Sequence, residues 1–337
     1  MRSTAAIRRV PALLGAAALL TATLAGCTGA PGSGGCDPAY VSGDASSLVT
    51  STGTFGSAPT VDFPTPLVAS KKPEVSTLIT GDGAPVGNDA QVDYSFSLYD
   101  GKSGDQLGKG GYSADQFARV ATKFAKHDEG VSSIGTALQC LTVGSRVAVV
   151  TTWADAKNAF SSDASEAVDD AATVVAVIDV SNAYLGKADG FNQLPVDGLP
   201  TVSTEVDGTP GVSILAQDAP KTSRSGVIKG GDGAKLKKDA KAVIHYSLWT
   251  WPTTRGDAAA QVGTTWSARQ AVTLQLTDIA DGGGVPTALL KALIGQRVGS
   301  QVLVVMPPGD DSFPAGQGPA GDDATYIFVV DLLGIQK

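Results

Sequence analysis

Alternating apolar and polar residues mark the strands of this chain. Residues 92–98 read Val-Asp-Tyr-Ser-Phe-Ser-Leu, and residues 242–248 repeat the alternation. Because successive side chains of a strand point to opposite faces, this period predicts strands with one buried face. Two apolar runs, at 172–180 and 324–332, predict a closing strand in each half of the chain.

The two halves are also related by an internal duplication. Gly-Asp-Gly-Ala at 81–84 recurs at 231–234, about a dozen residues before each alternating strand. We align these two strands with Tyr94 on Tyr246. Self-similarity of this kind indicates a repeated structural unit.

A third aligned block supports the same organisation. Residues 137–150 align without gaps on 292–305, and each block contains a short helical segment, a Gly-Ser turn and a Val-rich strand. We therefore expect one domain at 50–187 and a second at 200–337, joined by a linker at 188–199. Several strands with one short helix predict an α+β fold in each, with the helix packed on an antiparallel sheet.

The N-terminus has the pattern of a bacterial lipoprotein signal. Three arginines within the first nine residues precede an apolar run at 10–25 that is too short to span a bilayer comfortably. Leu-Ala-Gly before Cys27 resembles a lipobox, so we expect residues 1–26 to be removed. Lipid on Cys27 would hold the protein on the outer face of the cell membrane through a flexible tether at 27–49. The alternative is an ordinary signal peptide that is cut nearby, and both interpretations export the protein.

The net charge and the motifs of the sequence limit the classes of binding partner and cofactor that we expect. Lys and Arg number 25 and Asp and Glu number 33, so removing the three signal arginines leaves 22 against 33, a net charge of −11. Without a basic cluster, neither nucleic acid nor an anionic lipid surface is favoured as a partner. His127 and His245 lack acidic or cysteine neighbours at ligand spacing, and no phosphate loop or dinucleotide motif occurs. We expect no metal and no cofactor.

Two cysteines remain after Cys27 is set aside. An exported protein occupies a compartment that permits disulfides, so we expect a bond between Cys36 and Cys140. The alternative is two separate thiols, with Cys140 packed in the core.

The second copy carries an ordered set of short motifs: Val-Ile-His-Tyr at 243–246, Trp-Ser at 266–267, Val-Pro-Thr-Ala-Leu at 285–289, Val-Gly-Ser at 298–300, Met-Pro-Pro at 306–308 and Phe-Val-Val-Asp-Leu at 328–332. This set resembles the FKBP family of peptidyl-prolyl isomerases over most of residues 231–337. Two such domains behind a lipobox resemble a recurring actinobacterial arrangement. The resemblance implies a bent antiparallel sheet wrapped over a short helix, with an apolar pocket that accepts a prolyl ring.

The resemblance also implies the site residues. The catalytic wall would comprise Tyr246, Trp266, Val285, Pro286, Leu289 and Phe328, and substrate contacts would come from Leu274 and Phe313. Rotation about the peptide bond crosses a barrier of ~18–20 kcal/mol. The twisted amide at the top of this barrier has lost charge separation, so an apolar site favours it over the planar amide. From the residues alone, Tyr246, Trp266 and Phe328 are equally compatible with packing, and Phe313 with a loop anchor.

This sequence departs from the family pattern at several positions. Pro286 cannot donate the backbone N–H that the family uses, Ser267 replaces an aspartate, and Leu289 replaces an aromatic floor. In the first copy, Ala176 stands where the second has Phe328. We expect the first copy to be a structural or peptide-holding domain.

Three functions are compatible with these observations. The first is an extracytoplasmic prolyl isomerase that assists the folding of exported proteins and binds proline-containing peptides or unfolded chains. The second is a non-catalytic peptide-binding or chaperone-like lipoprotein on the same scaffold. The third is a purely structural envelope protein.

Overall fold

The computed structural model describes residues 36–113, 116–122, 132–160, 168–309 and 311–336. The predicted signal, Cys27 and His127 lie outside the described residues. Residues Gly32–Lys337 form one compact unit. Across the described residues, no helix has both the length and the apolar character needed to cross a membrane.

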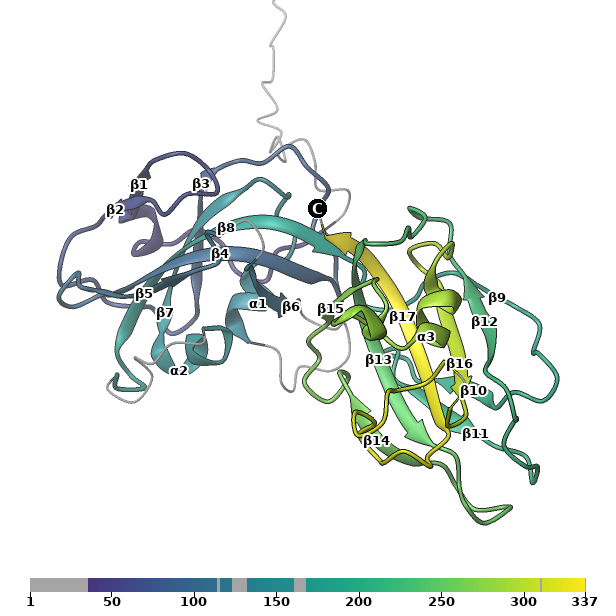
Figure 1. The fold of residues 1–337 in the computed structure, drawn as a ribbon. Helices are drawn as coiled ribbons and strands as arrows, with labels where there is room; N and C mark the ends of the chain where they lie inside the picture. Colours follow the sequence, from purple (N-terminus) through teal and green to yellow (C-terminus); the bar gives the residue numbers. More distant parts are fainter. Residues whose placement is uncertain (1–35, 114–115, 123–131, 161–167, 310, 337) are drawn as a thin grey trace, which may run out of the picture. The chain divides into compact units, whose positions relative to one another are not determined.

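The first half of the chain forms a six-stranded antiparallel sheet (Figure 1). Its order is β3-β7-β8-β4-β5, and β6 pairs with β4. The strands are β3 (Glu74–Ile79), β4 (Gln91–Asp100), β5 (Gln106–Gly110), β6 (Ala118–Ala121), β7 (Arg146–Thr152) and β8 (Thr173–Tyr184), preceded by the hairpin β1 (Thr50–Thr52) and β2 (Thr60–Asp62). Two short helices, α1 (Ser133–Ala137) and α2 (Trp153–Ala156), and 3-10 turns at Ser46–Leu48 and Lys157–Ala159 complete it. We call residues 74–184 the first repeat.

The second half forms a seven-stranded antiparallel sheet. Its order is β14-β13-β17-β16-β12-β9, and β15 pairs with β13. The elements are β9 (Phe191–Asn192), β12 (Arg224–Gly230), β13 (Lys241–Thr250), β14 (Ala260–Thr264), β15 (Val272–Gln275), a 3-10 turn (Ile279–Asp281), α3 (Thr287–Leu293), β16 (Gln301–Met306) and β17 (Tyr326–Gln336), with a separate hairpin, β10 (Thr201–Thr204) and β11 (Pro210–Ser213). We call residues 224–336 the second repeat. β9 lies inside the predicted linker, where its two residues left no alternation to detect.

The second sheet reproduces the strand order of the first, so the duplication is visible in the topology. Strands β14-β13-β17-β16-β12 correspond to β5-β4-β8-β7-β3, and β15 corresponds to β6. Each sheet carries three register shifts, and they lie at matching places. In the first sheet they lie between β4 and β8, between β4 and β5, and between β3 and β7, and in the second sheet they lie between the corresponding strands. The boundaries 50–187 and 200–337 remain a prediction, because the described chain is one compact unit.

The strand registers correct the alignment of the two central strands. Phe96 lies opposite Ile178 on β8, and Tyr246 lies opposite Val330, its counterpart on β17. Phe96, rather than Tyr94, is therefore the structural equivalent of Tyr246. The alignment was wrong by two residues, a shift that keeps the same face of the strand inward and that alternation alone cannot detect.

A close backbone approach explains the repeated Gly-Asp-Gly-Ala motif. A Cβ atom at Gly81 would lie 2.3 Å from the carbonyl oxygen of Val143, and one at Gly231 would lie 2.2 Å from that of Val298. Only glycine fits there, because each motif runs against the Val-Gly turn before β7 or β16.

The predicted α+β fold class is wrong. The helices α1, α2 and α3 contain five, four and seven residues, fewer than the roughly 12–15 that an isolated helix needs. The protein is mostly antiparallel sheet, and its helical turns form no layer of their own. Gly135 inside α1 is one reason, because glycine weakens a helix interior.

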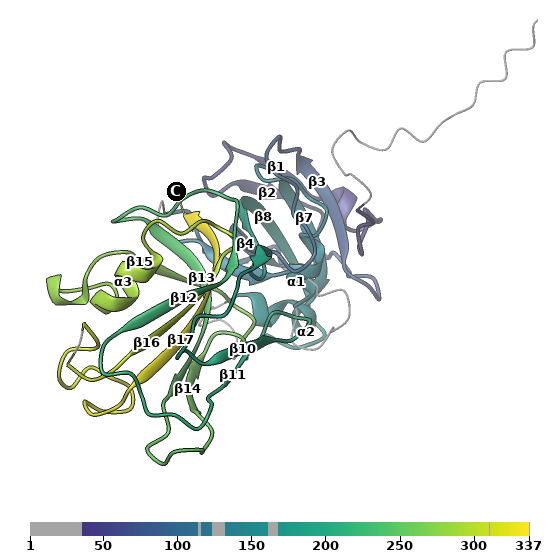
Figure 2. The ribbon, with the colours of Figure 1, turned by 90° about the vertical axis from the view of Figure 1, so that its right-hand side faces the viewer.

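Each sheet has an apolar cluster against its helical turns. In the first repeat the cluster includes Tyr94, Phe96 and Ile134, and in the second it includes Leu289 and Phe328. The opposite face of the second sheet, with Trp249 and Leu303, packs against Val202 and Val212 of the β10–β11 hairpin (Figure 2). Both faces of that sheet are therefore covered.

The two repeats meet around the buried side chain of Gln91. Its Oε1 accepts the Ala271 N–H at 3.0 Å, and its Nε2 donates to the Arg269 carbonyl at 3.0 Å and lies 3.3 Å from Nε2 of His245. Nearby, Arg119 pairs with Asp93 at 2.6 Å and donates to the Ala271 carbonyl at 3.2 Å. Polar groups of one repeat therefore form hydrogen bonds with polar groups of the other.

A disulfide joins Cys36 to Cys140, 104 residues apart. It ties the N-terminal segment to Cys140, three residues after the end of α1 at Ala137.

Candidate functional site

Six of the predicted site residues come together in the second repeat. Strands β13, β15 and β17, the start of α3 and the loop after β16 contribute to one apolar cluster that contains Tyr246, Leu274, Val285, Leu289, Phe313 and Phe328. Residues that are up to 82 positions apart in the chain therefore pack in one cluster.

Aromatic rings define the centre of this cluster. The ring centroids of Tyr246 and Phe328 lie 5.9 Å apart, and those of Phe313 and Phe328 lie 6.2 Å apart. Phe313 also meets Tyr326 edge to face, with centroids 5.0 Å apart. Leu289 and Phe328 are buried, whereas Tyr246 and Phe313 are half-buried. Leu289 and Phe328 thus form a floor, and Tyr246 and Phe313 form the accessible rim.

The hydroxyl of Tyr246 has no hydrogen-bond partner among the described residues, whereas the backbone N–H of Tyr246 donates to the Thr265 hydroxyl at 3.0 Å. A phenolic O–H next to an apolar floor is a donor that an incoming carbonyl can use. The equivalent position in the first repeat is Phe96, which has no hydroxyl.

The start of α3 offers fewer donors than the family pattern. Pro286 is the N-cap residue and has no N–H, and the Ala288 N–H donates to the Asp311 carbonyl at 2.9 Å. Asp311 also forms an ion pair with Lys291. The loop that carries Phe313 is therefore held against α3, and the Ala288 donor is already used.

The structure does not bring Trp266 to this cluster. Its ring stacks on His245, with centroids 4.3 Å apart, and only 6% of the residue is exposed. His245 points away from the face that carries Tyr246, because neighbouring strand residues alternate. The indole Nε1 is buried without a hydrogen-bond partner. Trp266 packs beside the sheet instead of lining the predicted pocket.

His245 lies between the repeats and takes part in the packing between them. Its Nδ1 lies 2.8 Å from the Thr265 hydroxyl. Burial, with a smaller contribution from Arg119, lowers its pKa to about 3. The ring is therefore neutral, and its Nε2 can accept from the Gln91 amide. Within the described part of the chain, no group of three His, Cys, Asp or Glu side chains could hold a metal ion.

Solved structures that are similar to this chain include proteins with FKBP domains. The three FKBP domains of wheat FKBP73 match with a TM-score of 0.28 and 15% identity, over 78% of this chain and 94% of that one. FkpA from Escherichia coli matches with a TM-score of 0.27 and 18% identity, over 40% and 51%. The N-terminal domain of FKBP42 from Arabidopsis thaliana matches with a TM-score of 0.28 and 19% identity, over 38% and 98%. No protein-family model matches the chain, and no curated protein is similar to it in sequence.

Four hollows on the described surface are lined by other residues. The largest two have volumes of about 880 and 740 Å³. The aromatic cluster of the second repeat is distinct from all four.

Proposed function

We propose that the second repeat binds proline-containing peptides and catalyses rotation about the X-Pro bond. The observation that carries this proposal is the half-buried Tyr246, whose hydroxyl is unbonded within the described structure and whose ring lies 5.9 Å from Phe328. The resemblance of residues 243–332 to the FKBP motifs supports the same assignment.

The chemistry requires no nucleophile. A prolyl ring would rest on Leu289 and Phe328, and Tyr246 would donate to the carbonyl before it. Rotation removes amide resonance, so the twisted state has less charge separation and is favoured by the apolar floor. Phe313 would cover the ring from the side of the loop.

Tyr246→Phe tests the proposal, because it removes the hydroxyl and keeps the ring. A hydrogen bond contributes roughly 0.5–1.5 kcal/mol, so kcat/KM should fall roughly twofold to tenfold in a proline-peptide isomerisation assay with the full chain. Phe328→Leu should reduce it further by opening the floor. Tyr99→Phe removes a hydroxyl from another half-buried tyrosine, which packs in a separate apolar cluster of the first repeat, and this control should leave the rate unchanged.

Activity that is equal in wild type and Tyr246→Phe, or that is lost in Tyr99→Phe alone, would contradict this assignment. Thermal melting followed by circular dichroism must first show that each variant is folded, since truncating a buried aromatic can cost ~3–5 kcal/mol.

A non-catalytic peptide binder is the second candidate, and one observation favours it. Pro286 lacks an N–H, and the N–H of Ala288 is engaged by Asp311, so the start of α3 offers little to hold a twisting carbonyl. Peptide binding that depends on Tyr246 without any rate acceleration would select this function.

We further propose that the chain is exported and anchored through lipid on Cys27. The lipobox-like Leu-Ala-Gly before Cys27 supports this, and no other cysteine follows such a triplet at the end of an apolar run. Cys27→Ala should move the protein from the membrane fraction to the soluble fraction and abolish incorporation of a labelled fatty acid. Retention of the label by the variant would refute the anchor.

A further inference from the structure

We propose that the first repeat contains a second peptide-binding site, which the chain's own segment Lys157–Phe160 occupies. Its ligand is an extended peptide that contains phenylalanine or proline. The site would recognise the ring of that residue together with the carbonyl group of the residue before it. This inference rests on the proposed function, because it assigns peptide binding to the strand position that Tyr246 holds in the second repeat.

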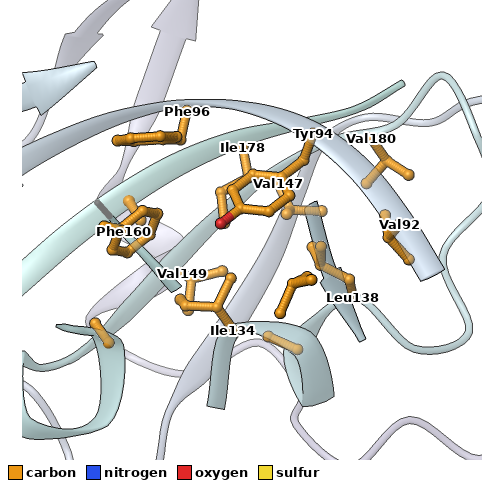
Figure 3. Close-up of a cluster of buried hydrophobic side chains, with 14 of the residues drawn as sticks. Val92, Tyr94, Phe96, Ile134, Leu138, Val147, Val149, Phe160, Ile178 and Val180 are labelled. Carbon is orange, nitrogen blue, oxygen red and sulfur yellow. The ribbon is translucent and has the colours of Figure 1, made fainter. Parts of the chain in front are cut away.

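The ring of Phe160 covers that position in the first repeat. Its centroid lies 4.6 Å from that of Phe96, the equivalent of Tyr246, and 6.5 Å from that of Tyr94. Figure 3 shows Phe160 below Phe96, on the side of the cluster toward which the Tyr94 hydroxyl points. Ala176 replaces Phe328 here, so the sheet itself leaves room for a ring. Phe160 is only 4% exposed and supplies that ring from a loop segment.

The segment also presents a carbonyl in the arrangement of an X-Pro peptide. The hydroxyl of Tyr94 donates to the carbonyl oxygen of Ala159. This carbonyl belongs to the amide bond that leads into Phe160, just as the carbonyl of an X-Pro bond leads into the prolyl ring. Burial raises the pKa of Tyr94, so its hydroxyl keeps its proton and remains a donor.

Among the described residues, the segment is otherwise held by the packing of Phe160 and Ala159 in the first repeat's apolar cluster and by two polar contacts. The Phe160 N–H donates to the Lys157 carbonyl at 3.3 Å, inside the segment itself. Lys157 pairs with Asp170 at 2.7 Å, but both side chains are exposed, and such pairs contribute little. On its other side, Asn158–Phe160 borders the hollow of about 740 Å³. The segment therefore has room to move when a peptide takes its place.

Binding stoichiometry tests the proposal. The full chain and its Phe160→Ala variant are titrated with fluorescein-labelled Ala-Ala-Pro-Phe, and anisotropy gives the number of peptides bound. Phe160→Ala should bind one more equivalent than wild type. Phe160→Ala combined with Tyr94→Phe should bind that added peptide at least twofold more weakly, because the donor for its carbonyl is gone.

The difference between the numbers of peptides bound by Phe160→Ala and by wild type tests this inference separately from the proposed function. If the second repeat does not bind peptides, wild type binds none and Phe160→Ala still gains one. If the inference fails, both chains bind the same number. Should Phe160→Ala not fold, Phe160→Leu keeps apolar volume without the ring, and the synthetic segment Ala-Lys-Asn-Ala-Phe must bind it in trans. No gain in the folded variant with either peptide overturns the proposal.

Discussion

At the scale of single residues, the two repeats treat one buried carboxylate in opposite ways. In the first repeat, Asp179 pairs with Arg146 at 2.5 Å, and both side chains are fully buried. In the second, Gln301 replaces the arginine and donates to Asp331 at 2.8 Å, while the Ala188 N–H donates to its other oxygen at 2.8 Å. Without a cation in contact, burial raises the pKa of Asp331 to about 6.

Asn substitution should therefore have opposite consequences at these positions. Asp179→Asn leaves Arg146 as a buried unpaired charge and should cost roughly 3–5 kcal/mol of unfolding free energy. In Asp331→Asn, the new amide can donate to the unpartnered Oε1 of Gln301 and no buried charge remains at neutral pH, so the variant should be at least as stable as wild type. Urea unfolding at neutral pH measures both. Equal losses would show that the two sites do not differ electrostatically.

The sign of the pH dependence follows from the raised pKa of Asp331. The folded chain keeps this proton up to about pH 6, whereas the unfolded chain releases it near 3.8. Stability from the protonated carboxyl is complete at low pH and is lost as the pH rises from about 3.8 to about 6. The unfolding free energy of Asp331→Asn should therefore rise relative to that of wild type as the pH increases from about 3.8 to about 6. His245 titrates in both chains, so its effect cancels in the difference.

The places of individual residues were the hardest feature of the structure to predict from the sequence. Alternation correctly indicated which residues of β4 and β13 face inward, but it could not distinguish Tyr94 from Phe96 as the partner of Tyr246. Carrying forward the 150-residue spacing of Gly81 and Gly231 would have done so. No sequence signal placed Trp266 on His245, because that contact depends on how the chain leaves β14.

At the scale of elements, period and turns predicted the long strands and failed for the short ones. Strands β4, β8, β13 and β17 have ten to twelve residues and a clear apolar pattern. By contrast, β9 has two residues and β15 has four, and exposed positions interrupt their pattern. The helical segments expected at the start of the blocks 137–150 and 292–305 lie mostly before them, because α1 ends at Ala137 and α3 ends at Leu293, and their brevity overturned the α+β fold class.

The disulfide is the covalent constraint at this scale, and its removal should destabilise the chain. It closes a loop of about 100 residues, for which chain-entropy models give ~4–5 kcal/mol. Cys36→Ser with Cys140→Ser should therefore lower the denaturant midpoint, and the m-value should rise because the unfolded chain without the cross-link exposes more surface. Thiol titration of the unfolded wild type serves as the control. An unchanged midpoint would mean that the tail contributes nothing to the fold.

At the scale of the whole molecule, Gln91 couples the repeats. Its amide satisfies the Ala271 N–H and the Arg269 carbonyl, which belong to the other repeat. Gln91→Ala leaves these groups without their partner, at roughly 1–3 kcal/mol for each buried group. The unfolding midpoint should fall accordingly, whereas Gln106→Ala, at an exposed position on β5, should leave it unchanged. Equal midpoints for both variants would argue against coupling.

The matched register shifts of the two sheets bear on the history of the gene. Each shift adds an unpaired residue to one strand, and three of them occur at corresponding places in sheets whose sequences have diverged widely. Independent acquisition of all three in both halves is a poor explanation. A single-repeat ancestor therefore already encoded them, and duplication copied an irregular sheet before the second copy kept the half-buried Tyr246 and the first buried its aromatic face under Phe160.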